Sequence, residues 1–251
     1  MTLFFIGIGL DNEQDITVKG LNIVKNCKKV FLEAYTSKLN CDLKKLEELY
    51  GKKIIIANRD LVEKNPDQIL DPTCDVAFLV IGDPLGATTH VDLMLRAKEL
   101  NIQIKVIHNA SIMNAIGSIG LELYKFGKTT SMPFFEPNFK AETPYLIIEQ
   151  NNSIKAHTLV LLDIKMDQNR FMTVNQAIEQ LLELEEKHQK GIFTEKTLCI
   201  GCARIGADDQ IIKAGTAKEL QEFDFGPELH SLIVPSQLHF MEEDALKIWS
   251  K

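Results

Sequence analysis

Apolar and polar positions alternate in blocks along the chain, and the blocks predict strands that alternate with helices. The strand candidates of the first half are residues 3–9, 30–35, 53–57, 76–81 and 103–107. Between them, apolar residues recur every three to four positions over 17–27, 42–50 and 91–100, as in amphipathic helices. This repeating order indicates parallel strands joined by right-handed crossovers.

The character of the sequence changes after His108. Small residues predict a helix over 111–119, and a looser stretch rich in Phe, Pro and Asn follows up to Pro144. Further strands are expected at 158–164, 198–203, 211–214 and 231–234, with helices at 173–188 and 240–249. Thr173 and Gln176 form a capping-box pattern at the start of the longer helix. We therefore expect an α/β protein of two subdomains, 1–109 and 110–251.

Composition narrows the class of protein. The 251 residues, 45% apolar and 25% charged, suit one large globular domain or two smaller ones. A formal charge of -7 without a dense Lys/Arg block argues against nucleic-acid binding. The sequence shows neither a signal peptide nor an apolar run near the roughly 20 residues of a membrane span. Five cysteines without a disulfide framework favour a reducing, cytoplasmic setting.

Residues 75–90 are the most informative segment. Its buried strand stops at Gly82-Asp83-Pro84, because proline cannot continue a strand and glycine permits a tight turn. Thr88 and Thr89 then stand where the next helix needs an N-cap. A strand, a turn and a helix start place this loop at the carboxyl edge of a parallel sheet, where open α/β folds bind ligands. The segment predicts a small-molecule site.

Two other segments are candidates for the same edge. A strand ends at His108, and Ser111 can cap the following helix or offer its hydroxyl. Gly7 and Gly9 form an incomplete dinucleotide fingerprint, and Glu33 stands near the position of a ribose-binding acid. A nicotinamide-dependent Rossmann enzyme is therefore an open alternative.

Cys199 and Cys202 have the spacing of a zinc or redox pair but lie within a predicted strand. Their odd offset sends the side chains to opposite faces, so we expect a structural role and no metal. The sequence contains no G-x-S-x-G elbow, P-loop or H-E-x-x-H motif. It therefore suits chemistry whose reactive atom belongs to a cofactor.

Several runs together resemble the diphthine synthases, a family of the tetrapyrrole methylase fold group. The matching runs are 5–10, 15–21, 33–37, 82–84, 87–90, 108–112, 124–127, 157–165 and 229–232, in order over nearly the whole chain. The run His108-Asn109-Ala110-Ser111 is similar to the eukaryotic branch of that family. Phe139 and Ser236 depart from its pattern, in which tryptophan and glycine are common.

The resemblance implies two α/β subdomains with the cofactor cleft between them, and an S-adenosylmethionine-dependent methyltransferase that forms a homodimer. The implied substrate is translation elongation factor 2, whose histidine carries a 3-amino-3-carboxypropyl group, an intermediate of diphthamide. The eukaryotic branch implies four methylations including a methyl ester, and the archaeal branch three. A tetrapyrrole or another small molecule is the alternative substrate of the same fold.

The resemblance also implies a set of cofactor contacts. They are Leu10, Asp83, Gly86, Ser111, Ile112, Leu162, Ile205 and His230. Backbone amides among them would hold the methionine carboxylate, and Leu162 and Ile205 would flank the adenine. The attacking amine must lose a proton, and the acceptor is open between water, a histidine and a carboxylate.

Overall fold

The computed structural model describes residues 1–250. It contains two compact units, Met1–Ala115 and a second that begins at Ile116. The subdomain boundary expected between residues 109 and 110 lies just before helix α5 (Ile112–Ala115), whereas the compact units divide at the end of that helix.

The first unit is built on a parallel five-stranded sheet in the order β3-β2-β4-β1-β5. Its strands are β1 (Thr2–Gly7), β2 (Lys29–Glu33), β3 (Ile55–Ala57), β4 (Val76–Val80) and β5 (Gln103–Ile107). Its helices are α1 (Val18–Asn26), α2 (Leu43–Tyr50), α3 (Arg59–Glu63), α4 (Val91–Glu99) and α5, with short 3₁₀ turns at Glu13–Asp15 and Pro66–Gln68. The predicted β–α alternation and the parallel pairing are confirmed.

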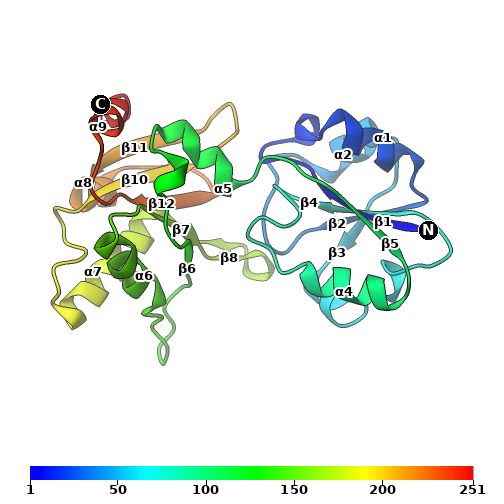
Figure 1. Cartoon of the computed structure of the whole chain (residues 1–251), viewed down its shortest axis with the longest axis horizontal. Helices are drawn as coiled ribbons and strands as arrows, with labels where there is room; N and C mark the ends of the chain where they lie inside the picture. Colours follow the sequence, from blue (N-terminus) through cyan, green and yellow to red (C-terminus); the bar gives the residue numbers. More distant parts are fainter. Residues whose placement is uncertain (251) are drawn as a thin grey trace. The chain divides into compact units, whose positions relative to one another are not determined.

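Both faces of this sheet are covered, which explains why its strands read as continuous apolar runs. Ile6 and Leu79 point to the face packed by α1 and α2, and Phe5 and Phe78 point to the face packed by α3 and α4. The rings of Phe5 and Phe78 meet edge to face, with centroids 5.6 Å apart. Figure 1 shows α1 and α2 on one side of the sheet and α4 on the other.

The second unit has a mixed sheet in the order β11-β10-β12-β7-β6. Its strands are β6 (Thr130–Met132), β7 (Thr158–Leu162), β10 (Leu198–Ala203), β11 (Ile211–Thr216) and β12 (His230–Val234), and β8 (Ile164–Lys165) pairs separately with β9 (Arg170–Phe171). Its helices are α6 (Thr143–Ser153), α7 (Val174–His188), α8 (Ala217–Glu222) and α9 (Phe240–Leu246), with 3₁₀ turns at Ile116–Ile119, Leu123–Lys125 and Met166–Gln168. Only the β6–β7 pair among these sheet neighbours is parallel.

Local details differ from the expectations in several places. The segment 111–119 forms the single turn of α5 and then a 3₁₀ turn, and α9 ends at Leu246. The N-cap of α4 is His90, without a side-chain cap. The hydroxyl of Thr88 donates instead to the carbonyl of Pro84 (2.8 Å), so it closes the preceding turn. The capping box of Thr173 and Gln176 is confirmed.

Across residues 1–250 the structure shows no helix both long and apolar enough to cross a membrane.

A buried carboxylate fastens α9 to its unit. The side chain of Glu242 is 1% exposed and accepts from Lys125 Nζ (2.7 Å) and from His157 Nε2 (2.9 Å). The backbone N–H groups of Glu122 and His239 donate to the same carboxylate. Burial opposes ionisation of Glu242, but these donors outweigh it and lower the pKa of its carboxyl from 4.5 to about 2.

Replacing this carboxylate, Glu242→Gln, should lower the free energy of unfolding by roughly 3 kcal/mol, because Lys125 and His157 lose their buried charged partner. The lowered pKa also makes wild-type stability depend on pH: the contribution is present above 4.5 and is lost as the pH falls towards about 2. Urea unfolding followed by circular dichroism across this range tests both effects. The exposed neighbour variant Glu243→Gln is the control; equal unfolding midpoints for the two variants would contradict the assignment.

Candidate functional site

Three loops leave neighbouring strands at the carboxyl edge of the first sheet. They follow β4, β1 and β5, which are adjacent in the sheet. Gly9 and Gly82 join the first two loops: Gly82 N–H donates to Gly9 O (2.7 Å) and Gly9 N–H to Gly82 O (3.4 Å). Both glycines have positive φ, +83° and +78°. The conformation requires residues that tolerate the left-handed region, and glycine does so at no steric cost.

Asp83 organises the loop after β4. The backbone N–H of Leu85 donates to its Oδ1 (2.9 Å), and the backbone N–H of Asn109 donates to its Oδ2 (3.2 Å). His108 Nδ1 lies 2.7 Å from the same Oδ2. Burial opposes ionisation of Asp83, but these hydrogen bonds outweigh it and lower the pKa of the carboxyl below its usual value. The loops after β4 and β5 are therefore joined by an ionised carboxylate.

Asn109, which was not among the predicted site residues, joins the loop after β5 to the loop after β1. Its side-chain amide donates to Gly7 O (3.0 Å) and to Asp15 O (2.9 Å). The carboxylate of Asp15 in turn accepts from the backbone N–H groups of Leu10 (3.1 Å) and Asp11 (2.8 Å). In the sequence, Asn109 stands only in a run of small polar residues after a strand. That pattern did not distinguish Asn109 from its neighbours as a residue that joins two loops.

Gly86, Ser111 and Ile112 lie on the loops that Asp83 joins. Ser111 is buried, and a Cβ added at Gly86 would lie 2.9 Å from its Oγ. The backbone at Gly86 therefore packs too closely against Ser111 to leave room for a side chain. With Leu10 and Asp83, these residues are the five predicted cofactor contacts of the first unit, and the loop contacts bring Asp83, Gly86 and Ser111 together.

Three backbone amides of the predicted contact set make hydrogen bonds within the protein. Leu10 N–H donates to Asp15, Gly86 N–H to Asp83 O (3.2 Å), and Ser111 N–H to Asn114 Oδ1 (2.8 Å). These three donors are engaged within the protein, so they are poor candidates for holding a free carboxylate. They hold the shape of the loops instead.

In the second unit, His230 begins β12 with both ring nitrogens engaged. Val174 N–H donates to its Nδ1 (3.3 Å), so Nε2 carries the proton and donates to the carbonyls of Gly226 (3.1 Å) and Pro227 (3.0 Å). Burial lowers the pKa of this imidazole, and the nearby Arg204 charge adds to the effect. The ring is therefore neutral and serves as a structural link.

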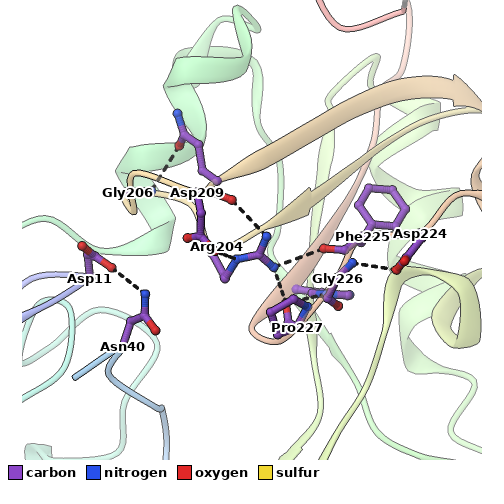
Figure 2. Close-up of polar contacts among 11 residues, drawn as sticks. Asp11, Asn40, Arg204, Gly206, Asp209, Asp224, Phe225, Gly226 and Pro227 are labelled. Atoms are coloured by element: carbon purple, nitrogen blue, oxygen red, sulfur yellow. Dashed lines mark hydrogen bonds and ion pairs between the residues drawn. The ribbon is translucent and has the colours of Figure 1, made fainter. Parts of the chain in front are cut away.

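Arg204 builds the loop that carries Ile205 and also supports the loop before β12. Its Nε donates to Asp209 Oδ2 (2.7 Å) and one terminal nitrogen to Asp209 O (2.9 Å), while the other donates to the carbonyls of Phe225 and Pro227. Figure 2 shows the guanidinium lying between these two groups of acceptors, and separately the Asn40 amide on Asp11 (3.2 Å). Ile205 and Leu162, the predicted apolar contacts, are both nearly buried, with 7% and 6% exposed.

Two alternative sites lose their support. The buried carboxylate of Glu33 accepts from Tyr35 N–H (2.9 Å), Thr36 N–H (2.8 Å) and the Thr36 hydroxyl (2.7 Å), so it is engaged in its own turn and not presented to a ribose. Cys199 and Cys202 are free thiols with 0% exposure, and burial raises both pKa values, to about 12 for Cys202. Such thiols are unreactive. Over residues 1–250 no group of His, Cys, Asp or Glu is arranged to hold a metal ion.

Comparisons with known proteins agree with this architecture. Residues 2–221 match the family model of the tetrapyrrole (corrin/porphyrin) methylases. The diphthine methyl ester synthase of Schizosaccharomyces pombe is 49% identical, over 98% of this chain and 94% of that protein. The diphthine methyl ester synthase of Homo sapiens is 47% identical, over 99% of this chain and 95% of that protein. A crystal structure of diphthine synthase matches with a TM-score of 0.91 at 33% identity, over 100% of this chain and 96% of that one.

The chain therefore belongs to the tetrapyrrole methylase family and, within it, to the diphthine methyl ester synthases. It is a methyltransferase, as the sequence resemblance implies. None of these relatives supports the nicotinamide-dependent alternative.

Removing the amide that joins the loops after β1 and β5, Asn109→Ala, should lower the free energy of unfolding by roughly 1–3 kcal/mol, because the carbonyls of Gly7 and Asp15 lose a donor. Asn109→Asp should be at least as harmful, since a carboxylate has the same shape but cannot donate. Urea unfolding measures both. Asn65→Ala, at an exposed asparagine whose side chain makes no cap, is the matched control; wild-type stability in both Asn109 variants would contradict the assignment.

Proposed function

We propose that this enzyme transfers methyl groups from S-adenosylmethionine to the 3-amino-3-carboxypropyl histidine of translation elongation factor 2, in the biosynthesis of diphthamide. The observation that carries the proposal is the nearly full-length similarity, at 47–49% identity, to enzymes named diphthine methyl ester synthase. The name also favours four methylations over three, the last forming a methyl ester. A tetrapyrrole substrate, which the family description names, has no support among these relatives.

The residues of the first unit fit such a cofactor. Glycine at position 86 lets the backbone of the loop after β4 pack closely against Ser111, and the Gly9–Gly82 bridge joins that loop to the loop after β1. We therefore propose Leu10, Asp83, Gly86, Ser111 and Ile112 as its contacts in this unit. From the second unit, the proposed contacts are Leu162, Ile205 and His230, with the two aliphatic side chains suited to a flat adenine.

The proposed reaction asks the protein chiefly for alignment. When bound, the cofactor supplies an already activated sulfonium methyl group, so no protein nucleophile is needed. The rigid loops would hold the acceptor nitrogen in line with that methyl, and most of the acceleration would come from orientation. Asp83 contributes by holding the shape of the loop, since its oxygens are engaged by Leu85, His108 and Asn109.

Two further parts of the proposal follow from the substrate and the family. Elongation factor 2 acts in the cytoplasm, so the enzyme is proposed to act there. A homodimer is proposed on the family resemblance, and a monomeric mass in solution would contradict it.

Incubating the protein with S-adenosylmethionine and elongation factor 2 bearing the aminocarboxypropyl histidine should add mass in methyl-sized steps, up to four. Intact-mass spectrometry counts the steps, and mild alkaline hydrolysis should remove only the ester methyl. Elongation factor 2 with an unmodified histidine is the matched control and should gain nothing. If the modified factor also gains nothing while the cofactor binds, the proposed acceptor is wrong.

Replacing the carboxylate that shapes the loop after β4, Asp83→Ala, should weaken S-adenosylmethionine binding by about tenfold, equivalent to about 1.4 kcal/mol. The physical reason is the loss of three hydrogen bonds that hold this loop against the loop after β5. Isothermal titration calorimetry measures the affinity, with the exposed Asp67→Ala as control. Wild-type affinity in Asp83→Ala would remove this residue from the proposed cofactor site.

A further inference from the structure

Asp83 and His108 form an acid–histidine pair at the proposed cofactor edge. His108 Nδ1 lies 2.7 Å from Asp83 Oδ2, and the two side chains differ sharply in exposure: 14% for Asp83 and 69% for His108. Asp83, the less exposed of the two, has three partners, because Leu85 N–H and Asn109 N–H also donate to it. His108 therefore has its Nδ1 held by Asp83, while the rest of its ring is open to an incoming group.

This contact determines which nitrogen of the neutral ring carries the proton. An ionised carboxylate can only accept hydrogen bonds, and Asp83 is kept ionised by its donors. Nδ1 must therefore be the N–H donor, which leaves Nε2 with a free lone pair. Within the described residues 1–250, no hydrogen bond engages Nε2 of His108. The pair thus presents an oriented proton acceptor, whereas in His230 the acceptor nitrogen is already satisfied by Val174.

The proposed reaction needs such an acceptor. The amine of an aminocarboxypropyl group is protonated near neutral pH and has no lone pair to attack with. A proton must leave its nitrogen before each of the three N-methylations. No such proton is present when the fourth methyl goes to the carboxylate, because an ionised oxygen attacks directly.

We propose that His108 Nε2 is the general base for the N-methylations and that Asp83 positions it; this inference rests on the proposed function. Nε2 takes a proton from the ammonium nitrogen of the substrate. The freed lone pair forms the new N–C bond while the methyl C–S bond breaks, and its electron pair stays on sulfur. The imidazolium, stabilised by the Asp83 carboxylate, then gives its proton to water. The methyl ester step does not use His108.

The difference between the nitrogen and oxygen steps provides the decisive kinetic test. Single-turnover rates are measured by intact mass on two substrates: elongation factor 2 with the aminocarboxypropyl histidine, and elongation factor 2 already trimethylated on nitrogen. His108→Gln should slow N-methylation by roughly 10²-fold or more, and should lower the ratio of N- to O-methylation rates by a similar factor. His188→Gln, at a histidine stacked on Tyr145 in the second unit, is the matched control and should keep the wild-type ratio.

A chemical rescue separates base catalysis from a structural role. His108→Ala leaves an open position at an exposed site, so added imidazole should restore N-methylation in proportion to its concentration. Imidazole should not accelerate the ester step.

A spectroscopic measurement needs neither substrate nor turnover. Long-range ¹H–¹⁵N NMR of the free protein should show His108 protonated on Nδ1 when neutral. In Asp83→Asn the side-chain amide can face the ring as a donor, and the proton should move to Nε2.

The outcomes are distinct. A fall in the N-to-O ratio, imidazole rescue and an Nδ1 proton support the inference. Equal slowing of both steps, or no slowing of either, overturns it, as does a neutral His108 protonated on Nε2 in the wild type. If the wild-type enzyme methylates neither form of elongation factor 2, the proposed function itself fails and the inference fails with it.

Discussion

The close approach of two backbones, at the ends of β1 and β4, is the constraint on which the proposed ligand edge depends. A Cβ at Gly7 would lie 2.5 Å from the Gly82 carbonyl, and Gly9 and Gly82 exchange backbone hydrogen bonds in left-handed conformations. Side chains at these positions would push the loops apart. Because the β1 and β4 ends lie this close, short side chains are long enough to join the loops. Asn109 reaches the end of β1, and Asp83 reaches His108 on the loop after β5. Because these loops pack so closely, none of them can move without displacing its neighbours.

The second unit reaches a comparable rigidity by different means. Its sheet is largely antiparallel, and buried charged groups hold several of its loops. Arg204 gathers four backbone and side-chain acceptors, and Glu242 gathers four donors. Desolvation makes such groups costly when a partner is missing, so each network favours one arrangement of its loops.

Much of the fold could be predicted from the sequence, because its signals were local. The parallel strands of the first unit followed from apolar runs separated by helical periodicity, and the start of α7 followed from one Thr–Gln pair. Thr88 shows where local chemistry has two solutions: its hydroxyl could accept a hydrogen bond as a helix N-cap or donate one to close a turn, and it donates to the Pro84 carbonyl. Contacts between distant residues left no local signal. The partners of Asn109 are 94 and 102 positions away, and His157 and Glu242 are 85 apart. The His108–Asp83 contact was unpredictable for the same reason. Both loops were predicted, but only the fold determines that their two side chains point toward each other.

The two buried thiols of β10 have a practical consequence for following the molecule in solution. Cys199 and Cys202 lie wholly inside the second unit, and their raised pKa values keep them protonated. A thiol reagent can reach them only when that unit opens, whereas Cys41 of the first unit is partly exposed in the native state. The chain thus carries built-in probes of local unfolding, and the labelling rates of individual cysteines would report the opening of the second unit without any introduced dye site.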